Sequence, residues 1–168
     1  MSTIETDRTR LRLWTMDDLE AFHSIWGDSR VIWWGDATDL AGSANKLASA
    51  IQISSACDDD IGWFAVELRD GTIIGNVMLQ PARSLPGDIE IGWHFARDYQ
   101  DEGYATEAAI AMLEYAWAST EADRVVATIV AANEPAKRVA TKLGMQNDGH
   151  ILHAGIDHDL WLIDRPTD

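Results

Sequence analysis

The sequence predicts an α+β (mixed α/β) fold built on one mixed β-sheet. Strand-like and helix-like patterns follow one another in the order β-α-α-β-β-β-α-β-α-β-β. An Asp70-Gly71 turn joins two apolar runs, which is typical of a β-hairpin, and two of the helical patterns separate strands as crossover connections do. At 168 residues, the chain is long enough for one domain over 1–168 and too short for two.

The first third of the chain predicts one strand and two helices. Residues 8–14 alternate in polarity, with basic side chains on one face, as a strand does. Thr15 is the expected N-cap of a helix that Gly27 ends. A second run of apolar residues at helical spacing covers 39–56.

The middle of the chain predicts three strands and a helix. The strand-like segments cover 62–68, 73–79 and 88–95, and the last alternates like a half-buried strand. A helix with an apolar stripe from Ala105 to Trp117 then follows the glycine at position 103.

The last third predicts strands around one short helix. Residues 124–130 form a β-branched run that is typical of a buried strand. Asn133 is the expected N-cap of a helix over 135–142, which Gly144 terminates. Two strand-like pieces close the chain, around 149–153 and 159–163.

The segment Gln100-Asp101-Glu102-Gly103-Tyr104-Ala105-Thr106 joins a strand to a helix through a short loop. The first N–H groups of a helix have no intrahelical acceptor, and the helix dipole adds partial positive charge there. The pattern therefore indicates an anion site suited to a phosphorylated cofactor. The alternative is an ordinary strand–helix connection in which Gly103 eases the turn.

Composition narrows the classes of partner. There are 28 acidic and 13 basic residues, for a formal net charge of −15, which disfavours nucleic acid and anionic membranes. The charge favours a cationic ligand, or serves only solubility. One cysteine, Cys57, excludes an internal disulfide framework. The absence of an apolar run of ~20 residues and of a signal-peptide pattern leads us to expect a cytoplasmic protein.

Three motifs resemble the GNAT superfamily of acyl-CoA-dependent N-acyltransferases, most closely its RimJ/RimL-like branch. They are Ile-Glu-Ile-Gly-Trp at 89–93, Gln-Asp-Glu-Gly-Tyr-Ala-Thr-Glu-Ala at 100–108, and the segment from Asn133 to Met145. The resemblance runs from Leu11 to Met145. It implies a GNAT-like, mostly antiparallel twisted sheet of about six to seven strands with about four helices on its faces.

The resemblance implies direct transfer of an acetyl group from acetyl-CoA to a primary amine in a ternary complex. The loop would bind the CoA pyrophosphate through backbone N–H groups, and the strand at 93–95 would splay from the strand at 125–130 to leave backbone groups for pantetheine. Asn133 would contact pantetheine or order the acceptor site. The implied cofactor-binding residues are Trp93, His94, Phe95, Gln100, Asp101, Glu102, Gly103, Tyr104, Ala105, Thr106, Asn133 and Lys137.

The chain departs from the family pattern at several positions. Asp101 and Glu102 stand where relatives carry Gly, Lys or Arg, and their charges oppose CoA binding. Ala136 replaces a common serine. Ala140 replaces a tyrosine that is proposed to protonate the leaving thiolate, so solvent or another group takes that role, or catalysis is impaired.

Glu90 and Asn133 are the candidate catalytic residues. Glu90 matches a family position given the role of general base, acting directly or through a water, and the alternative is a solvent-facing strand carboxylate. Glu107 fits a partner of the helix dipole better than a base. His94 fits a structural or surface imidazole better than a catalytic one.

The candidate substrate-binding residues are Trp33, Trp34 and Glu90. Tryptophan beside Asp36 and Asp39 would suit an ammonium group. The expected acceptor is a small-molecule or peptide amine, with a lean to a small cationic amine (an aminoglycoside or polyamine) or a protein N-terminus.

No metal is expected, because His150 and His153 point to opposite faces of a strand. The resemblance allows a homodimer. The alternatives to a transferase are a catalytically weak acyl-CoA-binding module and a protein-interaction domain that keeps only the scaffold.

Overall fold

A computed structural model describes residues 3–33, 35–56, 61–82, 85–153 and 155–167 of the chain. Its strands are β1 Ile4–Glu5, β2 Thr9–Leu13, β3 Trp63–Leu68, β4 Ile73–Pro81, β5 Ile89–Phe95, β6 Arg124–Val130, β7 Gln146–His153 and β8 Ile156–Asp164. Its helices are α1 Leu19–Trp26, α2 Leu40–Ala56, α3 Tyr104–Ser119 and α4 Glu134–Lys142, with 3₁₀ turns at Met16–Asp18 and Arg97–Tyr99. None of these helices is long and apolar enough to cross a membrane.

The strands of the described residues form one sheet in the order β1-β2-β3-β4-β5-β6-β8-β7. Only β5 and β6 are parallel neighbours, and the other pairs are antiparallel. The predicted α+β class is confirmed, and the described residues form four α-helices and eight strands. The strand beyond the expected number is β1, which pairs with β2 through only Ile4 and Glu5 and is too short to show a periodicity.

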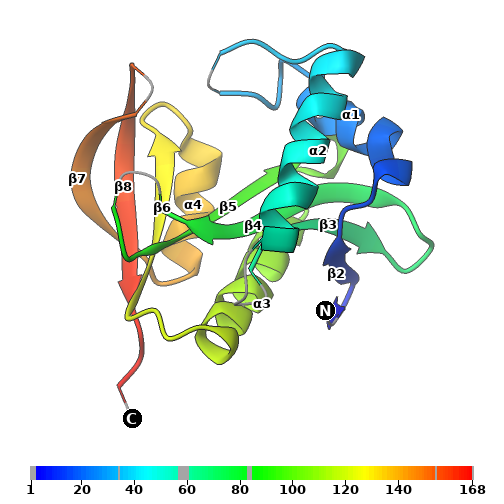
Figure 1. Cartoon of the computed structure of the whole chain (residues 1–168). Coiled ribbons are helices and arrows are strands. Elements are labelled where there is room, and N and C mark those ends of the chain that lie inside the picture. Colours follow the sequence, from blue (N-terminus) through cyan, green and yellow to red (C-terminus); the bar gives the residue numbers. More distant parts are fainter. Residues whose placement is uncertain (1–2, 34, 57–60, 83–84, 154, 168) are drawn as a thin grey trace.

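Helices cover both faces of the sheet (Figure 1), and a hydrophobic core lies on each side. On one face, α3 and α4 bury residues such as Met112 and Ala140 against the sheet. On the other face, α1 and α2 bury Phe22 and Leu47 in a second cluster. Ile89, on β5, belongs to the first core, so the next residue along the strand faces the side of α1 and α2.

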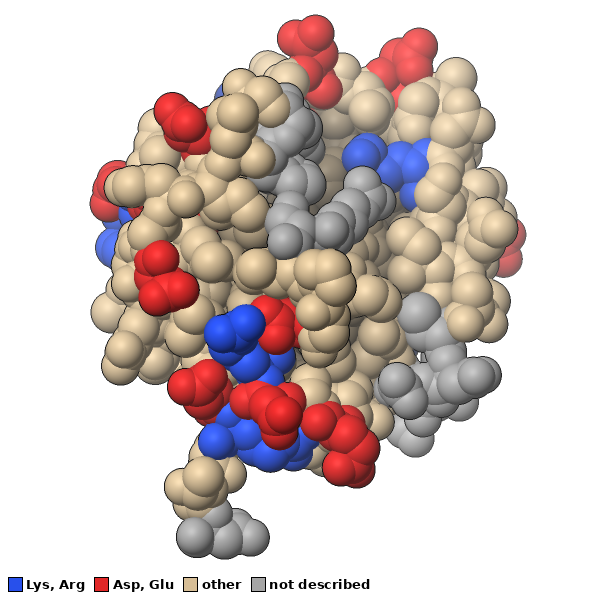
Figure 2. Space-filling model, turned by 60° about the vertical axis from the view of Figure 1, so that its left-hand side comes forward, with Lys and Arg blue, Asp and Glu red and all other residues tan. Residues whose placement is uncertain are grey.

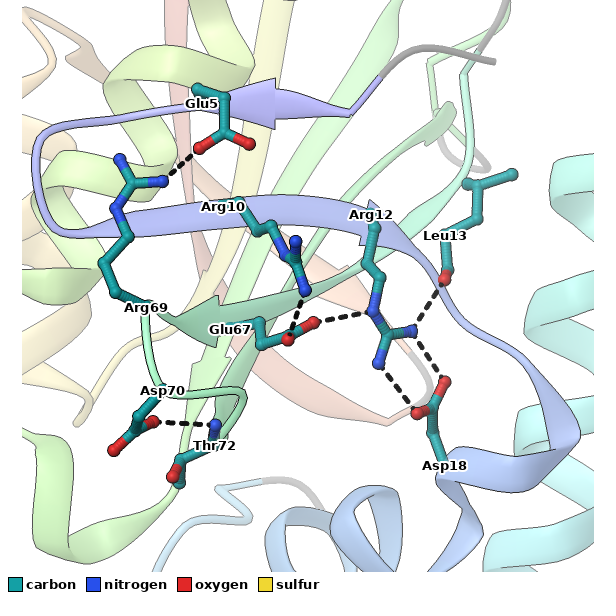
Figure 3. A network of polar contacts seen from close by, with 9 residues as sticks. All are labelled: Glu5, Arg10, Arg12, Leu13, Asp18, Glu67, Arg69, Asp70 and Thr72. Atoms are coloured by element: carbon teal, nitrogen blue, oxygen red, sulfur yellow. Dashed lines mark hydrogen bonds and ion pairs between the residues drawn. The ribbon is translucent and has the colours of Figure 1, made fainter.

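The basic face of β2 is neutralised by β3 and by the turn that follows β2 (Figure 3). Arg10 lies directly opposite Glu67 in the ladder and donates to it at 2.7 Å. Arg12 donates to the other oxygen of Glu67 at 2.7 Å and forms two 2.8 Å bonds to Asp18. Burial raises the pKa of Glu67, but the hydrogen bonds from the two arginines outweigh it, so the pKa lies below its usual value. The pattern of alternating arginines thus serves sheet packing.

The sheet opens between β5 and β6. The two strands pair only at Ile89 with Val125 and at Glu90 with Val126. Beyond these pairs β5 continues beside β4, and β6 continues beside β8. We call this divergence, which begins at Glu90, the fork. It is the splay between the two strands that the family resemblance implies.

Candidate active site

The 100–103 loop has the backbone shape of a helix-start anion site. Asp101 and Gly103 have φ values of 62° and 84°, in the left-handed region, and Gly103 is the N-cap of α3. The first helical hydrogen bond runs from the Glu107 N–H to the Gly103 carbonyl, so the N–H groups of 103–106 have no acceptor within the helix. These amides and the helix dipole favour an anion at this end of α3.

Side chains from three segments fix the shape of this loop. Gln100 donates from Nε2 to the Phe95 carbonyl at 2.9 Å and accepts from Arg97 at 2.9 Å. The Glu102 carbonyl accepts from the guanidinium of Arg8 at 3.0 Å. The side chain of Gln100 and the carbonyl of Glu102 are therefore part of the support for the loop.

A cavity of about 190 Å³, which we call the loop cavity, lies between the 100–103 loop and α4. Nine of the twelve predicted cofactor residues line it: Trp93, His94, Phe95, Gln100, Asp101, Gly103, Ala105, Thr106 and Asn133. Glu102, Tyr104 and Lys137 are not among its lining residues. The fold thus brings most of the predicted set to one place.

Two of the remaining residues have partners elsewhere. The Lys137 ammonium lies 2.7 Å from Asp159 on β8 and 3.2 Å from Glu134. The Tyr104 ring lies under the Arg8 guanidinium, 4.3 Å from ring centre to Cζ. In this arrangement Lys137 ties α4 to the sheet.

Sequence reasoning missed two cations of the loop cavity. Arg138 and Lys142 line it from α4, and both side chains are exposed. They stand four residues apart and so share one face of the helix, a spacing that was readable from the sequence. Arg138 also lies 3.7 Å from Asp101. The acidic loop therefore has basic neighbours. The expectation that Asp101 and Glu102 oppose CoA binding did not include these two cations.

A larger cavity of about 470 Å³, the fork cavity, is lined by residues of α1, α2 and the strands around the fork. It shares four lining residues with the loop cavity: Trp93, His94, Asn133 and Ala136. A ligand that passes between the strands at the fork can therefore reach from one cavity toward the other.

Glu90 lies at the base of the fork and lines the fork cavity. Its carboxylate accepts from the Thr128 hydroxyl on β6 and from Nε2 of Gln80 on β4 at 3.3 Å. Gln80 in turn accepts from the Trp63 indole at 3.1 Å. These contacts hold the carboxylate in one orientation beside the cavity.

His94 lies four residues after Glu90 on β5, so both side chains are on the same face of the strand. Its ring packs 4.5 Å from the Trp26 ring and lies 3.5 Å from the Asn76 amide. Desolvation lowers the pKa of His94 to about 3, and the charge of Lys46 acts in the same direction. The imidazole is neutral at neutral pH and is a poor proton donor there.

Asn133 begins α4 and borders both cavities. Its Oδ1 accepts from the Ala136 N–H at 3.2 Å, as predicted for an N-cap. Ala140, on the same helix, is fully buried in the core. This position offers neither a hydroxyl nor access to a leaving group.

Three described tryptophans line the fork cavity, and Trp33 lines the loop cavity. Trp33 is 41% exposed and lines the loop cavity, not the fork cavity. Trp34 and Cys57 lie outside the described residues. The fork cavity takes its indoles from Trp26, Trp63 and Trp93 instead.

The C-terminal hairpin also contributes to the fork cavity. His158, on β8, is buried, lines the cavity and has its Nδ1 2.8 Å from the Ile156 carbonyl. His150 pairs with Asp159 at 2.7 Å. Within the described part of the chain there is no group of three or more His, Cys, Asp or Glu residues placed to hold a metal ion.

Comparison with known proteins identifies the family of the chain. A family model described as an acetyltransferase (GNAT) domain matches residues 8–146. The uncharacterized N-acetyltransferase YnaD of Bacillus subtilis (strain 168) is 31% identical over 147 residues, which span 87% of this chain and 84% of YnaD.

Two solved structures show the same fold. A GNAT-family acetyltransferase from Bacillus anthracis has a TM-score of 0.81 at 26% identity, and the match covers 97% of this chain and 98% of that one. An aminoglycoside acetyltransferase in complex with coenzyme A has a TM-score of 0.79 at 21% identity, over 94% and 95% of the two chains.

Proposed function

The chain belongs to the GNAT acetyltransferase family and is an acyl-CoA-dependent N-acetyltransferase, and from this premise we propose that it moves an acetyl group from acetyl-CoA directly to a primary amine. The two cavities that meet at the fork carry this proposal, because one has a helix-start anion site and the other a fixed carboxylate. The motifs that resemble the RimJ/RimL-like branch support a place in that branch.

Acetyl-CoA would occupy the loop cavity. The N–H groups of 103–106 would bind its pyrophosphate, with Arg138 and Lys142 adding positive charge at the rim. Pantetheine would extend along the edge of β5 that has left β6, between Trp93 and Asn133. The thioester would then reach the fork, where the loop cavity and the fork cavity share lining residues.

The amine acceptor would occupy the fork cavity, with Glu90 as general base. The neutral amine nitrogen attacks the thioester carbonyl carbon, the C–N bond forms, and the C–S bond breaks to release CoA thiolate. The proton from the nitrogen passes to Glu90, directly or through a water. Holding the two reactants together at the fork supplies much of the rate.

The leaving thiolate would take its proton from solvent. The alanine at position 140 lies in the core and has no acidic group to offer. His94, neutral because of its lowered pKa, is a poor donor near neutral pH. This assignment predicts that no single side chain acts as the general acid for the leaving thiolate.

A thiol-release assay with acetyl-CoA and a panel of primary amines tests the proposal. Glu90→Gln keeps the shape of the side chain and should lower kcat by about 10²–10⁴-fold while acetyl-CoA still binds. Glu114→Gln, an exposed change on α3, should have wild-type kcat. Binding of CoA without turnover of any amine would favour the alternative, a catalytically weak acyl-CoA-binding module. A covalent acetyl-protein trapped during turnover would exclude direct transfer.

A further inference from the structure

The described lining of the fork cavity is not acidic, although the chain has a net charge of −15. Its described lining includes one carboxylate, Glu90, and one ammonium, Lys46, together with the histidines His94 and His158. On the face that Figure 2 presents, the acidic side chains are dispersed, and those near the C-terminal tail are interleaved with basic ones. The described lining of this cavity therefore does not share the acidic character of the whole chain.

A continuous wall joins the two charges. The Lys46 ammonium, on α2, lies over the Trp26 ring at 4.6 Å from its centre. The Trp26 and Trp63 rings are 5.7 Å apart, the Trp63 indole donates to Gln80 at 3.1 Å, and Gln80 donates to Glu90 at 3.3 Å. Two indoles thus separate a cation at one end from a carboxylate at the other.

Such a wall discriminates between amines by charge and by shape. An amine that binds at Glu90 and carries a second ammonium would place that charge toward Lys46, and like charges 4 Å apart repel by about 1 kcal/mol even in water. An anionic group at the same position would be attracted by a similar amount. Flat or apolar carbon between the two groups would pack on the indoles.

We propose that the acceptor is a zwitterionic monoamine, in which an apolar or aromatic body separates the reacting amine from a carboxylate that binds at Lys46. This inference rests on the proposed function, because it assigns the acceptor of the same site. It replaces the aminoglycoside or polyamine toward which the net charge leans. A peptide N-terminus fits only when the peptide also carries a carboxylate that can reach Lys46 while the amine is at Glu90.

Three amines that share one ring test the charge preference: 4-(aminomethyl)benzoate, benzylamine and 1,4-bis(aminomethyl)benzene. We expect kcat/KM of the wild-type protein to fall in that order, by about fivefold or more from the carboxylate to the diamine. Lys46→Met keeps the apolar stem and should bring the three values together. Lys46→Glu should reverse the order. Arg30→Met, which removes an exposed arginine paired with Asp28, should keep the wild-type order.

A wild-type preference for the diamine would overturn the inference, and so would a preference for the carboxylate that Lys46→Met leaves unchanged. Calorimetric titration of the CoA-bound protein with each amine provides a readout that does not need turnover. Binding of 4-(aminomethyl)benzoate that Lys46→Met weakens, without thiol release from any amine, would support this inference and reject the transferase mechanism. Thiol release that is equal for all three amines would support the transferase mechanism and reject this inference.

Discussion

Arg8 and Glu107 lie 99 positions apart in the sequence and are joined by two hydrogen bonds, from the Arg8 N–H at 2.8 Å and from its Nε at 2.7 Å. The Thr6 hydroxyl also donates to Glu107 at 2.6 Å, and the Arg8 guanidinium reaches the Glu102 carbonyl. The turn between β1 and β2 therefore holds the first turn of α3 and the 100–103 loop together. Burial raises the pKa of Glu107, but these hydrogen bonds outweigh it and keep the pKa below its usual value.

Glu107→Gln should loosen this support. The amide cannot accept all three bonds, so we expect the free energy of unfolding to fall by about 1–2 kcal/mol. The KM for acetyl-CoA should rise, because the amides of 103–106 lose their fixed orientation, while kcat changes less. Urea unfolding at pH 7 and initial rates measure the two effects. Glu114→Gln, on an exposed position of the same helix, should change neither. A rise in KM of equal size in both variants would contradict the supporting role of Glu107.

Arg138 and Lys142 should assist acetyl-CoA binding through charge alone. Changing both to glutamine should raise the KM for acetyl-CoA about fivefold or more at low salt, and the difference from wild type should shrink in concentrated NaCl. Lys137→Gln removes the ion pair with Asp159 and should act mainly by lowering stability. If Lys137→Gln raises KM more than the double variant does, the cofactor contact belongs to Lys137, as the sequence resemblance implies.

The elements around the site were predictable from the sequence because their signals are local. The alternation on β5, the glycine at position 103 and the asparagine at position 133 each fix a strand, a loop or a helix start through neighbouring residues. β1 has only two residues and owes its existence to pairing with β2, so no pattern within it could show it.

The walls of the fork cavity were not predictable in the same way. Trp26 comes from α1 and Trp63 from β3, and they meet because α1 packs on the face of the sheet to which Trp63 contributes. The helical spacing of Trp26 indicates a buried side but not which partner it contacts. The sequence likewise could not show that Trp33 lines the loop cavity, because its cavity neighbours include residues from β5 and α4.

His94 should make folding sensitive to mild acid. Its pKa is about 3 in the folded protein and about 6.5 in an unfolded chain, so between these values only the unfolded state takes up the proton. The free energy of unfolding therefore falls as pH decreases from about 6.5, by at most about 1.4 kcal/mol per pH unit from this residue. Asn76 on β4, Trp26 on α1 and Lys46 on α2 are the groups around the imidazole, and a protonated ring would face the lysine charge.

Urea unfolding of wild type and His94→Gln at pH 7.5 and pH 5.5 checks this prediction. The wild-type protein should lose more stability between the two pH values than the variant, because the other histidines remain in both proteins. The carboxylates with lowered pKa values, such as Glu67, release their stabilisation only below this range. Equal losses in the two proteins would show that His94 titrates at its ordinary pKa.

Arg165 closes the far end of α3 by donating to three backbone carbonyls. It reaches Trp117 at 2.7 Å, Thr120 at 2.6 Å and Ala122 at 2.9 Å, and its guanidinium lies 5.1 Å from the centre of the Trp117 ring. The last carbonyls of a helix lack intrahelical donors and carry partial negative charge. A planar cation with donors on every side can satisfy several of them at once, and an ammonium cannot do so in the same geometry.

Arg165→Met keeps the stem and removes the donors, so we expect the free energy of unfolding to fall by about 2 kcal/mol. Arg165→Lys should recover less than half of this loss, because a single ammonium replaces three directed bonds. Arg30→Met, at an exposed arginine paired with Asp28, should cost less than about 1 kcal/mol. Urea unfolding of the three variants measures these differences. If Arg165→Lys matches wild type, charge near the helix end is sufficient and the three directed bonds are not what holds the C-terminal segment to α3.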